Sequence, residues 1–150
     1  MTQAIAVLQP GVKIYATTMS PGYLYGMKLY PLIYTVQVSS LLYIEFETEH
    51  SLYQGAKIMI RLPGGLVLPD EGTPIAVTPL GGSTRVTEAT IVGGMIEILN
   101  FVQVEENAAP YKYSFGLSDI SNQISAKDAG DYAITTYYLD TDGQYYTVDT

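Results

Sequence analysis

The sequence contains no cysteine and no tryptophan, and His50 is its single histidine. Without cysteine the chain has no disulfide and no thiolate metal site, so packing or assembly must supply its stability. A zinc site or a Ser-His-Asp arrangement has only His50 to be built around. We therefore expect neither an enzyme nor a bound metal or cofactor.

Charge and long hydrophobic runs are also scarce. Only 15% of residues are charged, the seven basic residues are scattered singly, and the formal net charge is -8, which argues against a nucleic-acid partner. No apolar run approaches the roughly 18 residues that span a bilayer, so we expect no membrane span. The run "AIAVL" is too short for a signal-peptide core and no basic residue precedes it, so we expect any export signal to lie outside this numbering.

Tyrosine and glycine are abundant, with 14 of each in 150 residues. Tyr, Val, Ile and Thr favour strands, and strand-like runs recur at short intervals between turn residues. This pattern predicts an all-β fold, a single β-sandwich or flattened β-barrel of about ten strands. The expected strands cover residues 3–9, 12–18, 32–49, 56–63, 74–79, 84–92, 95–104, 111–118, 131–139 and 144–149.

Several local features of the connections are also predicted. Pro21-Gly22 and Pro31 are expected to enclose a connecting segment at 20–31, and Gly93-Gly94 and "DTDGQ" to form hairpin turns. Further expectations are a strand break at Ser39-Ser40, a loop at 64–74 with a short buried "LVL", and, as the place for a short helix, "SDISNQ".

Two expected strands carry opposite charges on their outer faces. The first carries Glu45, Glu47 and Glu49, which alternate with Leu42, Ile44 and Phe46, and the second carries Lys57 and Arg61. If these strands are neighbours, the charges face one another, each exposed pair being worth up to about 1 kcal/mol. An exposed carboxylate row gives its members one environment, unlike the two environments that a glycosidase needs.

Asp140 and Asp142 form a weak calcium candidate, because their oxygens have the spacing that opens a calcium loop. The loop lacks the later acidic ligand, and an Asp-Gly hairpin turn is the preferred interpretation. None of the three asparagines begins an N-glycosylation sequon, so possible glycans are limited to O-linked sugars.

The first residues are apolar and uncharged as far as Lys13. Residues 1–44 hold two lysines and no acidic residue, a charge of +2, whereas residues 45–150 hold five basic and fifteen acidic residues, a charge of -10. One interpretation is an ordinary first strand of the chain's own sheet. The other is a donor strand that is added to another copy. Its inserted residues would be Ala4, Ile5, Ala6, Val7, Leu8, Val12 and Ile14.

Three stretches, "YIEFETEHSLYQGAKIMIRLP", "YKYSFGLSDISNQ" and "GDYAITTYYLDTDGQYYTVD", resemble the strands of extracellular β-sandwich domains in microbial surface proteins. With the apolar arm in front, the chain resembles pilus and fibril subunits joined by donor-strand exchange, including helical fibrils of environmental origin. It departs from chaperone-usher pilins in having no cysteine pair. The resemblance implies a non-enzymatic structural subunit of an extracellular or cell-surface helical homopolymer.

On this hypothesis residues 1–31 are the donor strand and connecting segment, and residues 32–150 are the β-sandwich or barrel body. Tyr15, Tyr23, Tyr25 and Tyr30 are the expected subunit contacts, since tyrosine suits partly wet interfaces. The alternative is a monomeric adhesin-like or carbohydrate-binding module. Its ligand face would be the tyrosine-rich hairpin at 137–146. A secreted hydrolase centred on His50 is the third interpretation.

Overall fold

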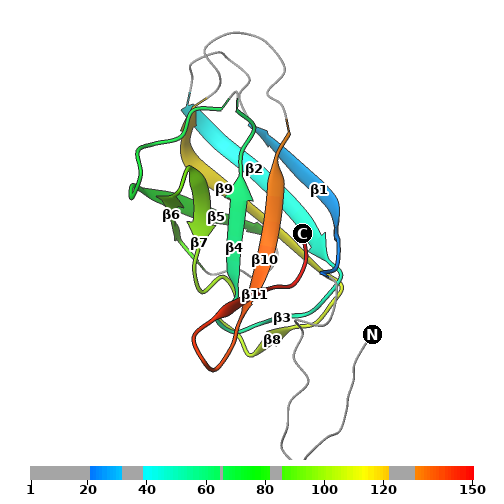
Figure 1. Cartoon of the computed structure of the whole chain (residues 1–150). Helices are drawn as coiled ribbons and strands as arrows, with labels where there is room; N and C mark the ends of the chain where they lie inside the picture. Colours follow the sequence, from blue (N-terminus) through cyan, green and yellow to red (C-terminus); the bar gives the residue numbers. More distant parts are fainter. Residues whose placement is uncertain (1–20, 32–38, 65, 82–85, 122–130) are drawn as a thin grey trace, which may run out of the picture.

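The computed structural model describes residues 21–31, 39–64, 66–81, 86–121 and 131–150 (Figure 1). These residues form strands and turns with no helix, which confirms the all-β prediction. The strands are β1 (Leu24–Pro31), β2 (Ser39–Thr48), β3 (Leu52–Tyr53), β4 (Lys57–Arg61), β5 (Pro74–Gly81), β6 (Glu88–Val92), β7 (Met95–Ile98), β8 (Glu106–Asn107), β9 (Tyr111–Ser121), β10 (Ala133–Leu139) and β11 (Tyr145–Thr147).

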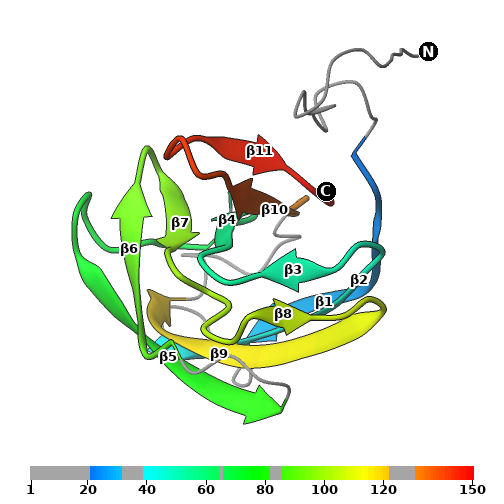
Figure 2. The ribbon, with the colours of Figure 1, turned by 90° about the horizontal axis from the view of Figure 1, so that it is seen from below.

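Nine of these strands form one antiparallel sheet in the order β1-β2-β9-β5-β6-β7-β4-β10-β11. The sheet curls, so that β1, β2 and β9 face β7, β4 and β10 across the core (Figure 2). The corner is made by β5, whose first residues pair with β6 and whose later residues pair with β9. The small β3–β8 sheet lies across one end. A curled sheet with two facing layers agrees with the predicted sandwich or flattened barrel.

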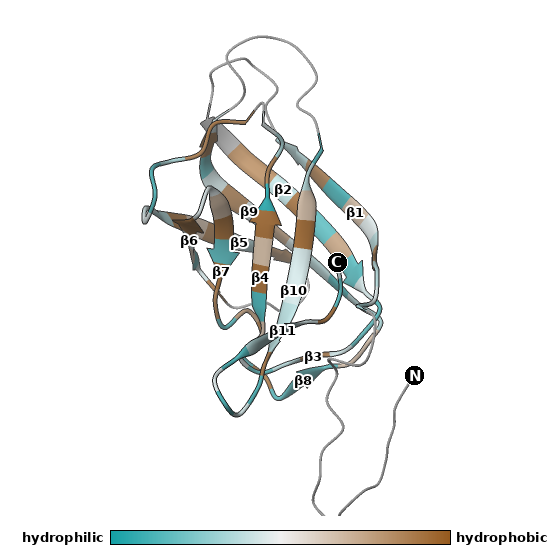
Figure 3. Ribbon diagram, in the orientation of Figure 1, coloured by the Kyte–Doolittle hydropathy of each residue, from teal (hydrophilic) through white to brown (hydrophobic). Residues whose placement is uncertain are grey.

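The core lies between the two layers and contains an aromatic cluster. Figure 3 shows hydrophobic residues recurring along β2, β4 and β9, as expected for strands with one buried face. Phe46 and Phe115 meet edge to face at 6.3 Å between ring centroids, and Phe101 lies 4.9 Å from Tyr113. All four rings are fully buried. The predicted inward residues Leu42, Ile44, Phe46, Ile58, Ile60 and Leu62 are all buried.

The prediction of a connecting segment at 20–31 is wrong, because residues 24–31 form the edge strand β1 and pair along their length with β2. Gly26 has φ +58° at a register shift in this pairing, so it forms an irregularity within the strand rather than ending it. Pro31 is the last residue of β1. A division of the chain after residue 31 separates this strand from the sheet to which it belongs.

The expected pairing of the glutamates with Lys57 and Arg61 is also wrong. β2 lies between β1 and β9, whereas β4 lies between β7 and β10, so the two strands are not neighbours. Glu45 instead lies 3.5 Å from Lys28 and 3.6 Å from Lys112, one on each adjacent strand. Lys57 lies 3.7 Å from Glu97 on β7. The chain passes from one layer to the other between β2 and β4.

Two smaller predictions also need correction. Ser118–Ser121 belong to β9, so the described part of "SDISNQ" is strand rather than helix. In "LVL", Leu66 and Leu68 are half-buried but Val67 is 46% exposed and bridges to Ser121. β2 begins at Ser39, and a register shift with β9 follows Ser40, while residues 32–38 lie outside the described residues. Both predicted hairpin turns are confirmed, with positive φ at Gly93, Gly94 and Gly143.

The environment of Glu45 predicts that part of the free energy of unfolding is lost in acid. Its carboxylate accepts a hydrogen bond from the Tyr43 hydroxyl (2.6 Å), and this bond, together with Lys112 and Lys28, lowers the pKa of Glu45 below its usual value of 4.5. Because the pKa of this carboxyl group is lower in the folded protein than in the unfolded protein, its charge stabilises the fold at pH values above the unfolded-state pKa. This stabilisation is lost as the pH falls through the folded-state pKa. We expect Glu45→Gln to lower the free energy of unfolding by about 1 kcal/mol near pH 7 and by much less near pH 3.

The measurement is urea unfolding of both proteins at these two pH values, with Glu88→Gln, at an exposed position of β6, as the matched control. If Glu45→Gln lowers the free energy of unfolding as much near pH 3 as near pH 7, the charge of Glu45 is not the cause of its stabilising effect.

Candidate functional site

The last three residues, Val148–Thr150, form a short segment that joins the two ends of the curled sheet. On one side, Gly22 N–H donates to Val148 O (2.8 Å) and Thr150 N–H donates to Gly22 O (3.1 Å), in a parallel bridge. On the other side, Thr136 of β10 exchanges backbone hydrogen bonds with Val148 and Asp149 at 2.8 and 2.9 Å. The 148–150 segment therefore connects the start of β1 to β10.

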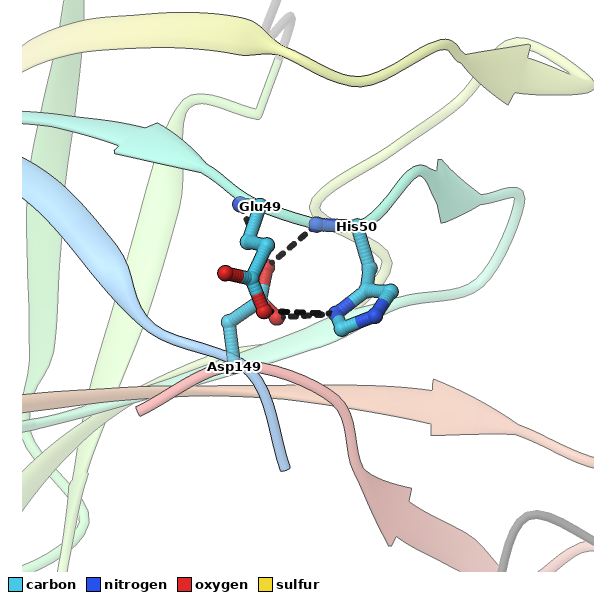
Figure 4. A group of neighbouring side chains, drawn as sticks. All are labelled: Glu49, His50 and Asp149. Carbon is cyan, nitrogen blue, oxygen red and sulfur yellow. Dashed lines mark hydrogen bonds and ion pairs between the residues drawn. The ribbon is translucent and has the colours of Figure 1, made fainter. Parts of the chain in front are cut away.

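The Asp149 side chain anchors this segment from within (Figure 4). One carboxylate oxygen, Oδ2, accepts the backbone N–H of Glu49 (3.0 Å) and of His50 (2.9 Å). The other, Oδ1, lies 2.7 Å from His50 Nδ1, so the Nδ1–H tautomer of the ring donates to it. Asp149 is 0% exposed, and these three donors compensate the burial of its charge. We call Glu49, His50 and Asp149 the clasp.

Gly22 lies against the clasp and leaves no room for a side chain. A Cβ built at this glycine overlaps Asp149 Oδ1, His50 Nδ1 and Glu49 Oε2. The Asp149 carboxylate cannot move away without giving up buried hydrogen bonds. The clasp can therefore form only when residue 22 has no side chain.

The clasp residues are also the group in the described part of the chain whose atoms are near enough to one another to hold a metal ion. However, both Asp149 oxygens and His50 Nδ1 already satisfy one another or the backbone, and Gly22 covers the point at which the three side chains converge. The geometry therefore favours a structural role. No hydroxyl nucleophile among the described residues is hydrogen-bonded to His50.

The sequence-predicted donor residues Ala4–Leu8, Val12 and Ile14, and the contact residue Tyr15, lie outside the described residues. The other three expected contact tyrosines lie at one edge of the sheet, on β1 or directly before it. Tyr23 is 66% exposed, Tyr25 48% and Tyr30 37%, and Met27 beside them is 39% exposed. Large apolar side chains are thus concentrated along the β1 edge.

The side chains of β1 that face outward are held by β2 and the clasp. Tyr25 donates to Glu49 Oε1 (2.6 Å), and this hydrogen bond raises the pKa of Tyr25 above its usual range. Tyr30 stacks on Tyr43 with ring centroids 5.0 Å apart. Tyr25 and Tyr30 therefore each have a partner within the protein, and such contacts lower the entropy cost of binding a second molecule.

One side of the β1 backbone has few hydrogen-bond partners among the described residues. One edge pairs with β2 from Leu24 to Pro31. Along the other edge, hydrogen bonds reach the 148–150 segment only as far as Leu24, whose N–H donates to Thr150 O (3.3 Å). Within the described ranges, Tyr25–Pro31 have no ladder partner on that side. An open, apolar edge is a template for adding a strand.

Asp140 and Asp142, the calcium candidates, are used by the β10–β11 hairpin turn. Asp140 Oδ1 accepts the N–H of Thr141 (2.8 Å), and Asp142 Oδ1 accepts the N–H of Gln144 (2.9 Å). These bonds are typical of Asp residues that stabilise a tight turn. The two residues are not part of the potential metal group in the described chain.

A second group of aromatic residues surrounds the same hairpin. Lys57 Nζ lies 4.2 Å from the centroid of the Tyr145 ring and 4.9 Å from that of Tyr137. Tyr53 and Tyr138 meet edge to face at 6.2 Å and are 44% and 37% exposed. This group is the surface on which a carbohydrate-binding interpretation would depend.

The sequence did not indicate the importance of Asp149. It lies about a hundred positions from His50, so no spacing rule connects the two.

Neither protein-family models nor curated proteins match this chain. In the described residues no helix is long and apolar enough to cross a membrane.

The packing of Gly22 against the clasp gives a direct prediction. We expect Gly22→Ala to lower the free energy of unfolding by about 1 to 3 kcal/mol, because the added methyl group overpacks a hydrogen-bonded site. The matched control is Gly64→Ala, since a Cβ at Gly64 meets nothing within 4 Å. Both changes restrict the unfolded chain alike, so their difference in urea unfolding reports on the clasp. Equal effects would contradict the close fit described above.

Proposed function

We propose that this protein is a structural, non-enzymatic subunit of an extracellular or cell-surface helical filament. In this proposal the apolar N-terminal strand of one protomer adds to the sheet of another. The observation that carries the proposal is the β1 edge, where Tyr25–Pro31 have no ladder partner among the described residues on one side and four large side chains are exposed.

An edge strand of this kind is unusual for a protein that works as a monomer. Monomeric proteins protect edges with charges, prolines, bulges or covering loops, because an open ladder promotes association. β1 has an irregularity at Gly26 and a terminal Pro31, and its single charge, Lys28, is 59% exposed and lies 3.5 Å from Glu45. The remaining exposed side chains are apolar or aromatic, so the edge favours an apolar partner.

The first residues of the sequence supply a partner of matching chemistry. They are uncharged up to Lys13 and contain Ile5, Val7 and Leu8. Burying about four such side chains contributes roughly 6 to 12 kcal/mol as an upper estimate. The positive charge of residues 1–44 and the negative charge of residues 45–150 also favour association. A head-to-tail contact of this kind repeats without closing and generates a helical polymer.

The proposal predicts that charge in the donor strand stops assembly. We expect the full-length chain to form filaments in negative-stain electron microscopy, and the double variant Ile5→Asp, Val7→Asp to remain dispersed, because a carboxylate is costly to bury in an apolar contact. The matched control, Thr2→Asp with Gln3→Asp, adds the same charge at polar positions and should assemble.

A synthetic peptide of residues 1–18 should also shorten filaments when added during assembly, since it occupies the acceptor without providing a new one. If the unmodified chain stays monomeric and folded over a wide concentration range, the filament proposal is wrong.

The tyrosines around the β10–β11 hairpin favour one alternative, a carbohydrate-binding or adhesin-like module. Aromatic rings with polar tips, such as Tyr53 and Tyr138, suit sugar surfaces. A melting temperature that rises with calcium and loses this response in Asp142→Ala would support the alternative, as would glycan binding lost in Tyr138→Ala.

A further inference from the structure

We infer that the donor strand is accepted in the seam between β1 and β10, in line with the 148–150 segment; this inference rests on the proposed filament function. The seam is bounded by two strand edges, Tyr25–Pro31 of β1 and Ala133–Thr135 of β10. The reasoning starts from the hydrogen bonds that connect these strands at one end and are absent beyond it within the described residues.

The 148–150 segment fills the space between β1 and β10 at one end only. It is hydrogen-bonded to Gly22 and Leu24 on one side and to Thr136 on the other. Figure 1 shows its end, marked C, between β10 and β1, with both strands continuing past it. Beyond the level of Thr150, no described residue bridges the two strands.

The open edge of β10 has backbone groups available for a new strand. Thr136 directs its N–H and C=O toward the 148–150 segment. Because these groups alternate between the two edges along a strand, those of Ile134 face the same side. Thr135 and Thr150 still touch through their hydroxyl oxygens at 3.3 Å, so Ile134 is the residue that lies next beyond the segment. A strand inserted in the seam would bond to Ile134 and to β1 at once.

The chemistry of the seam suits an uncharged apolar strand. β10 carries no ionisable side chain other than its tyrosines, and the single charge on β1 is paired with Glu45. Ile134 is buried in the core, and Leu29 of β1 is half-buried and packs against the core from the other side. Alternate apolar side chains of an inserted strand would extend this core, and the others would lie beside Met27 and Tyr30.

The occupant that fits is residues 4–10 of a second copy. This stretch is uncharged and apolar, it can place Ile5 and Val7 on one face, and its length is close to that of β1, which has eight residues. Pro10 has no N–H, so it ends a ladder where Pro31 ends β1. Residues 11–20, which include Val12 and Ile14, connect this stretch to Pro21 and can span about 33 Å when extended.

Because the chain has no cysteine, single engineered cysteines report the docking site in the full-length protein. Val7→Cys chains are mixed with Met27→Cys chains, allowed to assemble, and treated with a short bifunctional maleimide. In the control mixture the second chain carries Thr147→Cys, an exposed position on β11, the opposite edge strand of the nine-stranded sheet. Filament formation is followed in parallel by negative stain.

We expect crosslinked dimers from the first mixture in at least about fivefold excess over the control mixture, because docking raises the local concentration of the two thiols. If filaments form normally but crosslink through Thr147→Cys, the seam is not the docking site, and the filament proposal still holds. A chain carrying both Val7→Cys and Met27→Cys that crosslinks only within the monomer would show that the seam accepts the chain's own strand, which overturns the inference. Absence of filaments from unmodified protein would overturn both proposals.

Discussion

The buried carboxylate of Asp149 is the interaction on which the rest of this structure depends. A fully buried charge is tolerated only when hydrogen bonds replace its hydration, and here two backbone N–H groups and His50 Nδ1 do so. These bonds hold the 148–150 segment against the end of β2. The segment in turn bridges β10 to Gly22, so one side chain keeps the two ends of the curled sheet together.

The clasp lies beside the part of β1 and β10 that has no strand partner among the described residues. Pairing between β1 and the 148–150 segment stops at Leu24, and pairing of β10 with that segment stops near Thr135. β1 then continues as an edge strand with Tyr25, Met27 and Tyr30 exposed. In the filament proposal the acceptor is this apolar edge beside a hydrogen-bonded closure, where only the added strand has to become ordered on binding.

Much of the fold could be predicted from the sequence because strands are recognised locally. Period-two alternation placed Leu42, Ile44 and Phe46 on a buried face, and their burial is confirmed. Glycine pairs and Asp-Gly predicted the two hairpin turns, because those turns require positive φ. Strand order could not be predicted in this way. Glu45 pairs with Lys28 on β1 and with Lys112 on β9, whereas the sequence pattern placed its partners on β4.

The candidate site was predictable only in part, for the same reason. The apolar, uncharged character of residues 1–12 is visible in the sequence, and so is the surplus of tyrosine before β2. β1 itself was missed because its glycine and flanking prolines are also the residues of a connecting loop. Asp149 was missed because its partners lie far away along the chain, and only the folded sheet brings them together.

The most direct test of this account is amide hydrogen exchange, compared between the dispersed full-length protein and its filaments. The account predicts that the amides of Tyr25–Tyr30 that are not bonded to β2, and the amide of Ile134, exchange readily in the dispersed protein and become strongly protected in filaments. The amides of Glu49 and His50, already bonded to Asp149, are protected in both states. Filaments in which these amides of Tyr25–Tyr30 still exchange as fast as in the dispersed protein would contradict the claim that another copy completes the sheet at this edge.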